Sequence, residues 1–249
     1  MVIAIVNNKG GTGKTTSTIN IGKALSLKEK KTLLIDLDPQ ANLSYSFGVT
    51  TEGCILGEVL LDRKITKNDI YTVEKVDIIP STNELIDYEF EFIKQNYPFT
   101  LFKETIAEVK NKYDFILVDC PPSVSYLTVN ALIAADAVLI PMQMDVLSLQ
   151  GLNQILNAIE NIRKEYNPDL YVLGVLAVLV DERRQLTNEI LQIVNNEYGI
   201  HVFNNYIRQN VKAAEAPSFG LSVIEYAPTS NSAIDYLNVT KEIMNILKN

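Results

Sequence analysis

The sequence predicts an α/β fold with an open, doubly wound, mostly parallel sheet and helices on both faces. Short apolar runs rich in β-branched residues alternate with longer segments whose apolar residues recur at helical spacing. Such alternation is typical of a parallel sheet with right-handed crossovers. The runs are almost continuously apolar, which indicates strands buried on both faces. A polar motif follows three of the runs, and ligands of open α/β sheets bind at the carboxyl ends of strands.

The positions of the strands and helices follow from this alternation of apolar runs and helical spacing. We expect strands at 2–6, 32–36, 76–80, 114–118, 137–141 and 171–179. We expect helices at 14–29, 83–95, 99–111, 125–135, 146–166, 184–198 and 232–247. The stretch 49–75 is the least regular and the hardest to place. Because no repeat, low-complexity tract or long linker interrupts the pattern, residues 1–249 are predicted to form a single domain, with no helix-turn-helix domain before the first strand.

Composition narrows the class of protein. The chain has 249 residues, of which 47% are hydrophobic, so it can bury a sizeable core. Its net charge of −8 excludes a global basic field, and any contact with DNA must come from a local patch. Cys54 and Cys120 lie far apart without metal-ligand spacing, which argues against a disulfide framework or a zinc site. With no apolar run of membrane-spanning length, we expect a soluble, cytoplasmic protein.

The first motif is the glycine-rich stretch 7–16, NNKGGTGKTT, between the first strand and the first helix. Glycines let backbone N–H groups approach phosphate oxygens, and the helix N-terminus adds partial positive charge. Lys14 would contact the terminal phosphates and Thr15 would offer its hydroxyl to Mg²⁺. This is nearly a P-loop, with Asn8 in place of its first glycine. The expected nucleotide-binding residues here are Lys9, Gly10, Gly11, Thr12, Gly13, Lys14, Thr15 and Thr16.

Lys9 is a second lysine in a loop that already has one. A cation at the start of the loop can point away from its own phosphates, toward another subunit. The simpler interpretation is a solvated surface lysine. Because the residue stands among phosphate-binding glycines, we favour a functional role.

The second motif is LLIDLDPQAN, residues 33–42. Strand alternation puts Asp36 and Asp38 on one side, and two carboxylates that close need a cation or a bound water between them. Mg²⁺ beside a triphosphate supplies that cation. One carboxylate would then orient the attacking water and the other would support the metal shell. The alternative is an ordinary strand end followed by an Asp-capped turn.

The third motif is YDFILVDCPP, residues 113–122. Four apolar residues ending in Asp119 have the form of a Walker B strand, whose carboxylate reaches Mg²⁺ directly or through water. Pro121 and Pro122 stiffen the loop that follows. This pattern occurs by chance in many strands, and its value here is that it follows the other two motifs in the correct order.

Taken together, the three motifs resemble those of the ParA/Soj partition ATPases, the deviant-Walker group that also includes MinD. The similarity continues through 130–132, Pro141, 147–152, 207–212 and 215–220, so that it spans nearly the whole chain.

The resemblance implies a cycle in which ATP and Mg²⁺ bring two subunits face to face. Lys9 would be the signature lysine that reaches the partner's phosphates, and Asp38 would position the attacking water. Asp119 and Thr15 would serve Mg²⁺, with Asp36 in support. The loop around Pro217 would lie near the adenine. A ParB-like partner with a basic N-terminal peptide would stimulate hydrolysis.

The resemblance also implies DNA binding without sequence preference and a location on the nucleoid. Arg208 and Lys212 are four residues apart and would share a helix face if that turn is helical. Arg183 and Arg184 form another basic pair. A symmetric dimer would present each cation twice, and phosphate contacts would make binding salt-sensitive. The alternative is that these residues are ordinary surface charges.

Two other functions remain open. The first is a metabolic enzyme that couples ATP to a small-molecule reaction on the same fold, of the ligase or amidotransferase type. It would have no need for a lysine in trans. The second is a MinD-like regulator that cycles on and off the membrane. It would require the segment 232–249 to bind lipid, whereas we interpret that segment as the last core-packing helix.

Overall fold

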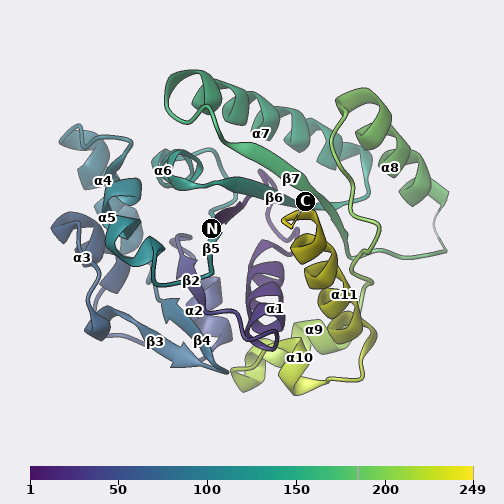
Figure 1. The fold of residues 1–249 in the computed structure, drawn as a ribbon, viewed down its shortest axis with the longest axis horizontal. Coiled ribbons are helices and arrows are strands. Elements are labelled where there is room, and N and C mark those ends of the chain that lie inside the picture. Colours follow the sequence, from purple (N-terminus) through teal and green to yellow (C-terminus); the bar gives the residue numbers. More distant parts are fainter. Residues whose placement is uncertain (184, 249) are drawn as a thin grey trace.

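The computed structural model describes residues 1–183 and 185–248. Within them, seven strands form one sheet in the order β3-β4-β2-β5-β1-β6-β7, and all neighbours are parallel except β3 and β4 (Figure 1). The strands are β1 Val2–Ile5, β2 Thr32–Asp36, β3 Tyr71–Val73, β4 Val76–Ile79, β5 Phe115–Asp119, β6 Ala137–Gln143 and β7 Tyr171–Val178. The predicted doubly wound, mostly parallel α/β fold is confirmed.

Helices cover both faces of the sheet because the strands expose apolar side chains on both sides. One layer contains α1 (Lys14–Ser26), α2 (Asn42–Ser46), α9 (Val211–Glu215), α10 (Val223–Tyr226) and α11 (Asn231–Ile246). Figure 1 shows α1 and α11 side by side. The other layer contains α3 (Ile55–Asp62), α4 (Leu85–Lys94), α5 (Leu101–Lys110), α6 (Tyr126–Ala134), α7 (Val146–Glu165) and α8 (Gln185–Tyr198).

The stretch 49–75 contains α3, a short 3₁₀ turn at Lys67–Asp69 and the edge strand β3. Strand β3 pairs antiparallel with β4 through a tight turn in which Glu74 and Lys75 both have positive φ. Such turns usually carry Asn or Gly, whose absence hides the hairpin in the sequence.

Beyond β7, the chain returns beside that strand as an extended segment. Backbone hydrogen bonds join Val175 to His201 and Phe203, and Val180 to Ile207. Arg208 forms an isolated parallel bridge with Val180, and Lys212 lies in the separate helix α9. Arg208 and Lys212 therefore do not share a helix face, because Arg208 lies outside α9, in the isolated β-bridge with Val180 just beyond β7.

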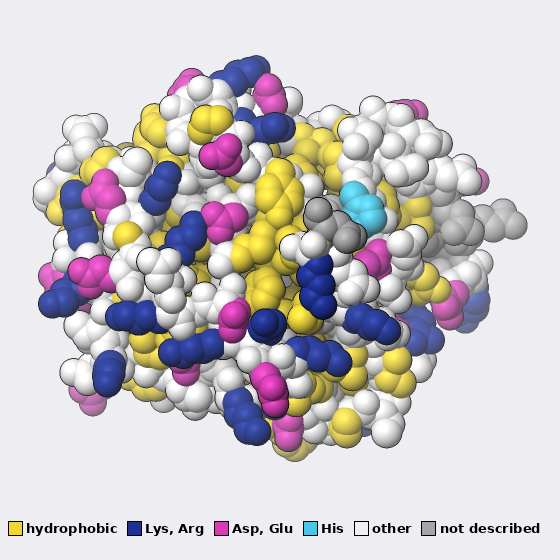
Figure 2. All heavy atoms as spheres, in the orientation of Figure 1, with side chains coloured by type: hydrophobic (Ala, Val, Ile, Leu, Met, Phe, Trp, Pro, Cys, Tyr) yellow, Lys and Arg dark blue, Asp and Glu magenta, His cyan; other side chains and the backbone are white. Residues whose placement is uncertain are grey.

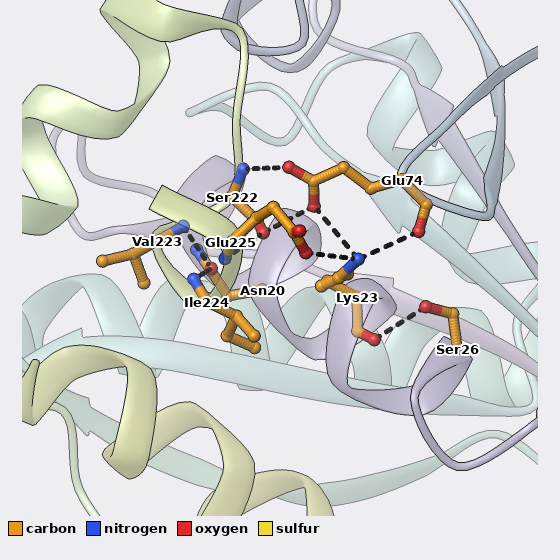
Figure 3. A network of polar contacts seen from close by, with 8 residues as sticks. All are labelled: Asn20, Lys23, Ser26, Glu74, Ser222, Val223, Ile224 and Glu225. Atoms are coloured by element: carbon orange, nitrogen blue, oxygen red, sulfur yellow. Dashed lines mark hydrogen bonds and ion pairs between the residues drawn. The ribbon is translucent and has the colours of Figure 1, made fainter. Parts of the chain in front are cut away.

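A buried polar network ties α1 to the β3–β4 turn and to α10 (Figure 3). Lys23 on α1 is 4% exposed, and its Nζ lies 2.9 Å from a carboxylate oxygen of Glu225 and 3.7 Å from one of Glu74. Glu74 also accepts hydrogen bonds from the backbone N–H and hydroxyl of Ser222. The Asn20 side-chain oxygen accepts the backbone N–H of Val223. The network fixes the chain that leads out of α9 against the helix that follows the phosphate loop.

The last helix, α11, packs its buried side chains, which include Tyr236, Val239 and Ile243, into the core beside α1. This is the core-packing role that the sequence predicts for 232–247. Within the described residues, no helix has both the length and the apolar character needed to cross a bilayer.

Candidate nucleotide-binding site

The glycine-rich loop connects the carboxyl end of β1 to the first residue of α1, Lys14. Gly11 and Gly13 have φ values of 72° and 69°, which only glycine adopts without strain. The Lys9 carbonyl accepts a hydrogen bond from the Thr12 hydroxyl at 3.2 Å and from the Lys14 ammonium at 3.3 Å. The loop is therefore closed around its own backbone, with the N-terminus of α1 facing the space where a phosphate would lie.

Two amide side chains at strand ends hold this loop; the first motif includes Asn7 without giving its side chain a role, and no motif includes Gln143. The Asn7 side chain donates to the Pro141 carbonyl at 2.6 Å and accepts the Lys9 N–H at 3.1 Å. The Gln143 side chain donates to the Gly11 carbonyl at 3.2 Å. Both residues directly follow apolar runs, so the rule that sites form at strand ends could have found them.

Lys14 is buried, with 6% exposure, beside the carboxylates that follow β2 and β5. Burial lowers its pKa, and the charges of Asp119 and Asp38 act in the opposite direction. Within the described residues, the Lys14 ammonium has one hydrogen-bond acceptor, a carbonyl at 3.3 Å, and it is under-satisfied because it has three donors. The oxygens of a bound phosphate would provide the missing acceptors.

Asp119 and Asp36 lie opposite each other in the β2–β5 register, and both are completely buried. Asp119 accepts the Thr15 hydroxyl at 2.7 Å. Burial raises the pKa of Asp119 well above its usual range, and the neighbouring Asp36 raises it further. Burial likewise raises the pKa of Asp36 to about 6. Two buried carboxylates that resist ionisation in this way are placed to receive a cation.

Asp36 is only half satisfied by the protein. One carboxylate oxygen accepts the backbone N–H and hydroxyl of Ser44, at 2.8 and 2.6 Å. The other is buried and has no hydrogen-bond partner within the described part of the chain. Mg²⁺ usually binds through one or two protein oxygens, with phosphate and water completing its shell. The set formed by the Thr15 hydroxyl, Asp119 and the half-satisfied Asp36 fits that pattern. Residues 1–183 and 185–248 contain no cluster of three or more acidic, His or Cys side chains of the kind that binds a metal by itself.

Asp38 and the phosphate loop line the same cleft of about 780 Å³. One Asp38 oxygen accepts the Gln40 N–H at 2.9 Å, which fixes the carboxylate at the start of the turn after β2. Ile86, Glu89 and the loop 121–123 line another part of the cleft. Asn210, Ala213 and Ala214 line it as well, but Pro217 follows them in the next turn and is not part of the lining.

Lys9 has a different environment from Lys14. Its ammonium forms an ion pair with Asp145 of the same chain at 2.9 Å, and both side chains are 36% exposed. Asp145 is the N-cap of α7 and also accepts the N–H and hydroxyl of Ser148. Burial acts to raise the Asp145 pKa, but the hydrogen bonds from Lys9 and Ser148 outweigh it and leave the pKa below its usual value. The Lys9 ammonium is thus held by Asp145, and Lys9 is not part of the lining of the cleft that contains Lys14.

Three of the four candidate DNA-binding cations have an acidic neighbour. Arg208 makes a bidentate contact with Asp235, which is only 8% exposed as a side chain, and Arg208 also lines the nucleotide cleft. Lys212 pairs with Glu215, and Arg183 pairs with Asp181. Arg184 lies outside the described residues. On the face shown in Figure 2, basic side chains lie interspersed with acidic ones.

A glycine loop that opens a helix, with acidic residues at the ends of two adjacent parallel strands, defines the P-loop nucleoside triphosphatases. The family model described as an AAA domain matches residues 1–172. The sporulation initiation inhibitor protein Soj of Bacillus subtilis is 38% identical over 97% of both chains. The chromosome partitioning protein ParA of Myxococcus xanthus is 35% identical over 98% of this chain and 87% of its own. The chain therefore belongs to the ParA/Soj family of chromosome-partitioning P-loop ATPases.

The solved structure of a metabolic enzyme has a similar fold. Cobyrinic acid a,c-diamide synthase from Mycobacterium smegmatis, solved with an ATP analogue and magnesium, superposes with a TM-score of 0.86 at 29% identity. The match covers 100% of this chain and 96% of that one.

Proposed function

We propose that this protein is a ParA-type ATPase that forms a face-to-face dimer with ATP and moves or positions a DNA or protein cargo. The observation that carries the proposal is the contrast between its two loop lysines. Lys14 is buried among carboxylates, as a lysine that binds the phosphates of its own subunit should be. The Lys9 side chain is 36% exposed, and the one partner of its ammonium within the described residues is Asp145, in an ion pair near the surface. Such pairs contribute little stability, so a partner's phosphates can replace Asp145.

The other site residues take the roles that their contacts suit. The backbone N–H groups of the loop, with Thr12, Thr16 and Lys14, bind the phosphates. Thr15, Asp119 and Asp36 would hold Mg²⁺, which would supply positive charge beside the phosphates. Asp38 lines the cleft with one oxygen fixed by the Gln40 N–H, and it orients the attacking water.

The remaining parts of the proposal rest on the family. They are non-specific DNA binding in the ATP state, stimulation by a ParB-like partner, and a cytoplasmic, nucleoid-associated location. Lys212 supports DNA contact best, because its ion pair with Glu215 is on the surface and phosphates can compete for it. The Arg183 side chain is 89% exposed, but it makes a bidentate contact with Asp181, whose side chain is 20% exposed. Arg208 is held more firmly by Asp235.

The alternatives make opposite predictions about oligomeric state. The structural match to cobyrinic acid a,c-diamide synthase keeps an ATP-coupled metabolic enzyme as the second candidate. Such an enzyme has no need of Lys9 in trans, and Lys9→Ala would leave its turnover unchanged. A MinD-like membrane cycle would need α11 to leave the core, where it buries Tyr236 and Val239.

Sedimentation and DNA binding in ATP and in ADP, at several salt concentrations, test the proposal. The expected result is a dimer on DNA with ATP and a monomer with ADP. Lys9→Ala should abolish the dimer, whereas Lys112→Ala, which also replaces an exposed lysine, should not. A wild-type chain that stays monomeric with ATP at every concentration and ignores DNA would refute the proposal.

A further inference from the structure

The nucleotide cleft is lined by two chemically different groups of residues. The glycine loop supplies backbone N–H groups and positive charge for phosphates. A second group comes from α9 and its N-cap and consists of Asn210, Ala213 and Ala214, which we call the α9 wall. Val178 and Ile207 add apolar side chains to the same cleft. Because apolar and small residues with a few polar groups are typical of sites for organic ligands, we expect the nucleoside to lie against the α9 wall.

The α9 wall has little packing of its own. Helix α9 has only five residues, and none of the five is buried. Among residues 210–220, all within the described part of the chain, only Ala216 is buried. A helix of this length is not stable in isolation. The position of the wall therefore depends on the elements that hold α9.

Helix α10 is the element that holds the end of α9. The hydroxyl of Tyr226, the last residue of α10, donates a hydrogen bond to the Glu215 carboxylate at 3.0 Å. The Tyr226 ring also stacks on Phe219, with the ring centroids 4.8 Å apart. Because α10 has only four residues, it too needs support from the rest of the fold.

The buried network in Figure 3 fixes α10 from two sides. The Asn20 side chain on α1 accepts the Val223 N–H at 2.9 Å. Ser222, the N-cap of α10, donates its backbone N–H and its hydroxyl to Glu74 in the β3–β4 turn, at 2.9 and 2.6 Å. The Lys23 ammonium lies 3.7 Å from a Glu74 oxygen, and both side chains are 5% exposed. Buried polar groups that are paired in this way specify one arrangement of the elements that carry them.

The contacts thus run from α1, which begins at the phosphate loop, through α10 to the α9 wall. From this geometry we propose that Asn20, Lys23 and Glu74 are positioning residues, which hold the α9 wall where the nucleoside binds. None of the three is among the described residues that line the cleft. The proposal rests on the nucleotide site proposed above, but not on the proposed dimer.

The test compares ADP with pyrophosphate, which carries the phosphates without the nucleoside. Isothermal titration calorimetry with Mg²⁺ measures ADP binding to the full-length protein, and displacement of bound ADP measures the affinity for pyrophosphate. Asn20→Ala removes the acceptor of the Val223 N–H, and Glu74→Ala removes both acceptors of Ser222. If the wall is then in place about a tenth of the time, ADP binds about tenfold more weakly. Pyrophosphate should bind both variants as it binds the wild type.

Asn130→Ala is the matched control for Asn20→Ala. Both asparagines are 2% exposed, and both donate to the carbonyl four residues earlier in their own helix. Asn130 also accepts a backbone N–H at the start of another helix, that of Phe102 in α5, but it lies in the other layer. Its replacement should leave both affinities unchanged, whereas Lys14→Ala should weaken both. Urea midpoints establish that each variant is folded under the conditions of the titration.

Three results would overturn the proposal. Unchanged ADP binding by both Asn20→Ala and Glu74→Ala would show that the network does not position the wall. Equal losses for ADP and pyrophosphate would place the effect in the phosphate loop. The same selective loss in Asn130→Ala would reduce the effect to lowered stability. If instead the wild-type chain stays monomeric with ATP while the selective loss for ADP is observed, the positioning role stands and the proposed dimer fails.

Discussion

Replacing Asp36 by Asn should stabilise the protein in the absence of nucleotide. Asp36 is completely buried, and burial raises its pKa from 3.8 to about 6. Because the folded carboxyl has the higher pKa, the folded state binds more protons than the unfolded state between these values. The contribution of Asp36 to stability therefore falls as pH rises from about 4 to about 6 and is constant above. Asn keeps the shape and an oxygen for Ser44 without the buried charge.

The size of the effect follows from the shift. A pKa difference of about 2 units, at 1.36 kcal/mol per unit, corresponds to about 3 kcal/mol at neutral pH. Asp36→Asn should recover most of this above pH 6 and almost none near pH 4. Urea unfolding from pH 4 to 8 without Mg²⁺ or nucleotide measures the difference. Asp87→Asn, an exposed carboxylate on α4, serves as the control and should change stability by less than about 0.5 kcal/mol.

Mg²⁺ with ATP should reverse the order of stability of the wild type and Asp36→Asn. If Asp36 supports Mg²⁺, then Mg²⁺ with ATP should stabilise the wild type more than Asp36→Asn, and the variant should hydrolyse ATP more slowly. The reasoning would be refuted if Asp36→Asn were less stable than wild type at pH 7 without ligand and the difference did not change with pH. Asp36 would then not be a buried charge that lacks a cation.

Three other predictions concern the cleft and the DNA contact. Lys14→Ala should weaken ATP binding by at least about thirtyfold in a nucleotide titration, because a buried charge pair is lost; unchanged affinity would count against the cradle. Asp38→Ala should still dimerise with ATP but hydrolyse it about 10² to 10⁴ times more slowly; wild-type turnover in a phosphate-release assay would assign the water to another residue. Lys212→Glu should weaken DNA binding and lower the salt-dependence slope by about 1 per contact removed, with intact ATPase; an unchanged slope would exclude Lys212.

The parallel core was predictable because periodicity alone determines it. The sequence predicts a strand at 32–36, and β2 is Thr32–Asp36. It predicts a helix at 232–247, and α11 is Asn231–Ile246. Strands buried on both faces are unmistakably apolar, and the polar residues after them mark the sheet edge where the site forms. The phosphate loop, Asp38 and Asp119 could be predicted from the sequence for the same reason, because each stands at or just after the end of an apolar run.

The rest depends on contacts between distant residues. The Asp145 that holds Lys9 is 136 residues further along the chain, and no local pattern links them. The edge strand β3 is short and its turn uses Glu74 and Lys75, so neither length nor turn composition reveals it. Helix α3 has only eight residues, which is too few for its apolar residues to show a clear helical period.

The candidate DNA-binding cations show most clearly what sequence spacing omits. Arg208 and Lys212 are four residues apart, which on one helix would make a joint basic patch. Instead, Arg208 continues the sheet edge and binds Asp235 on α11, while Lys212 pairs within its own helix. Phosphates that bind Arg208 must first displace the Asp235 carboxylate, which is 8% exposed, whereas those that bind Lys212 displace the Glu215 carboxylate, which is 43% exposed. If DNA binds here, its affinity should therefore depend more on Lys212 than on Arg208, although spacing alone gives the two residues equal weight.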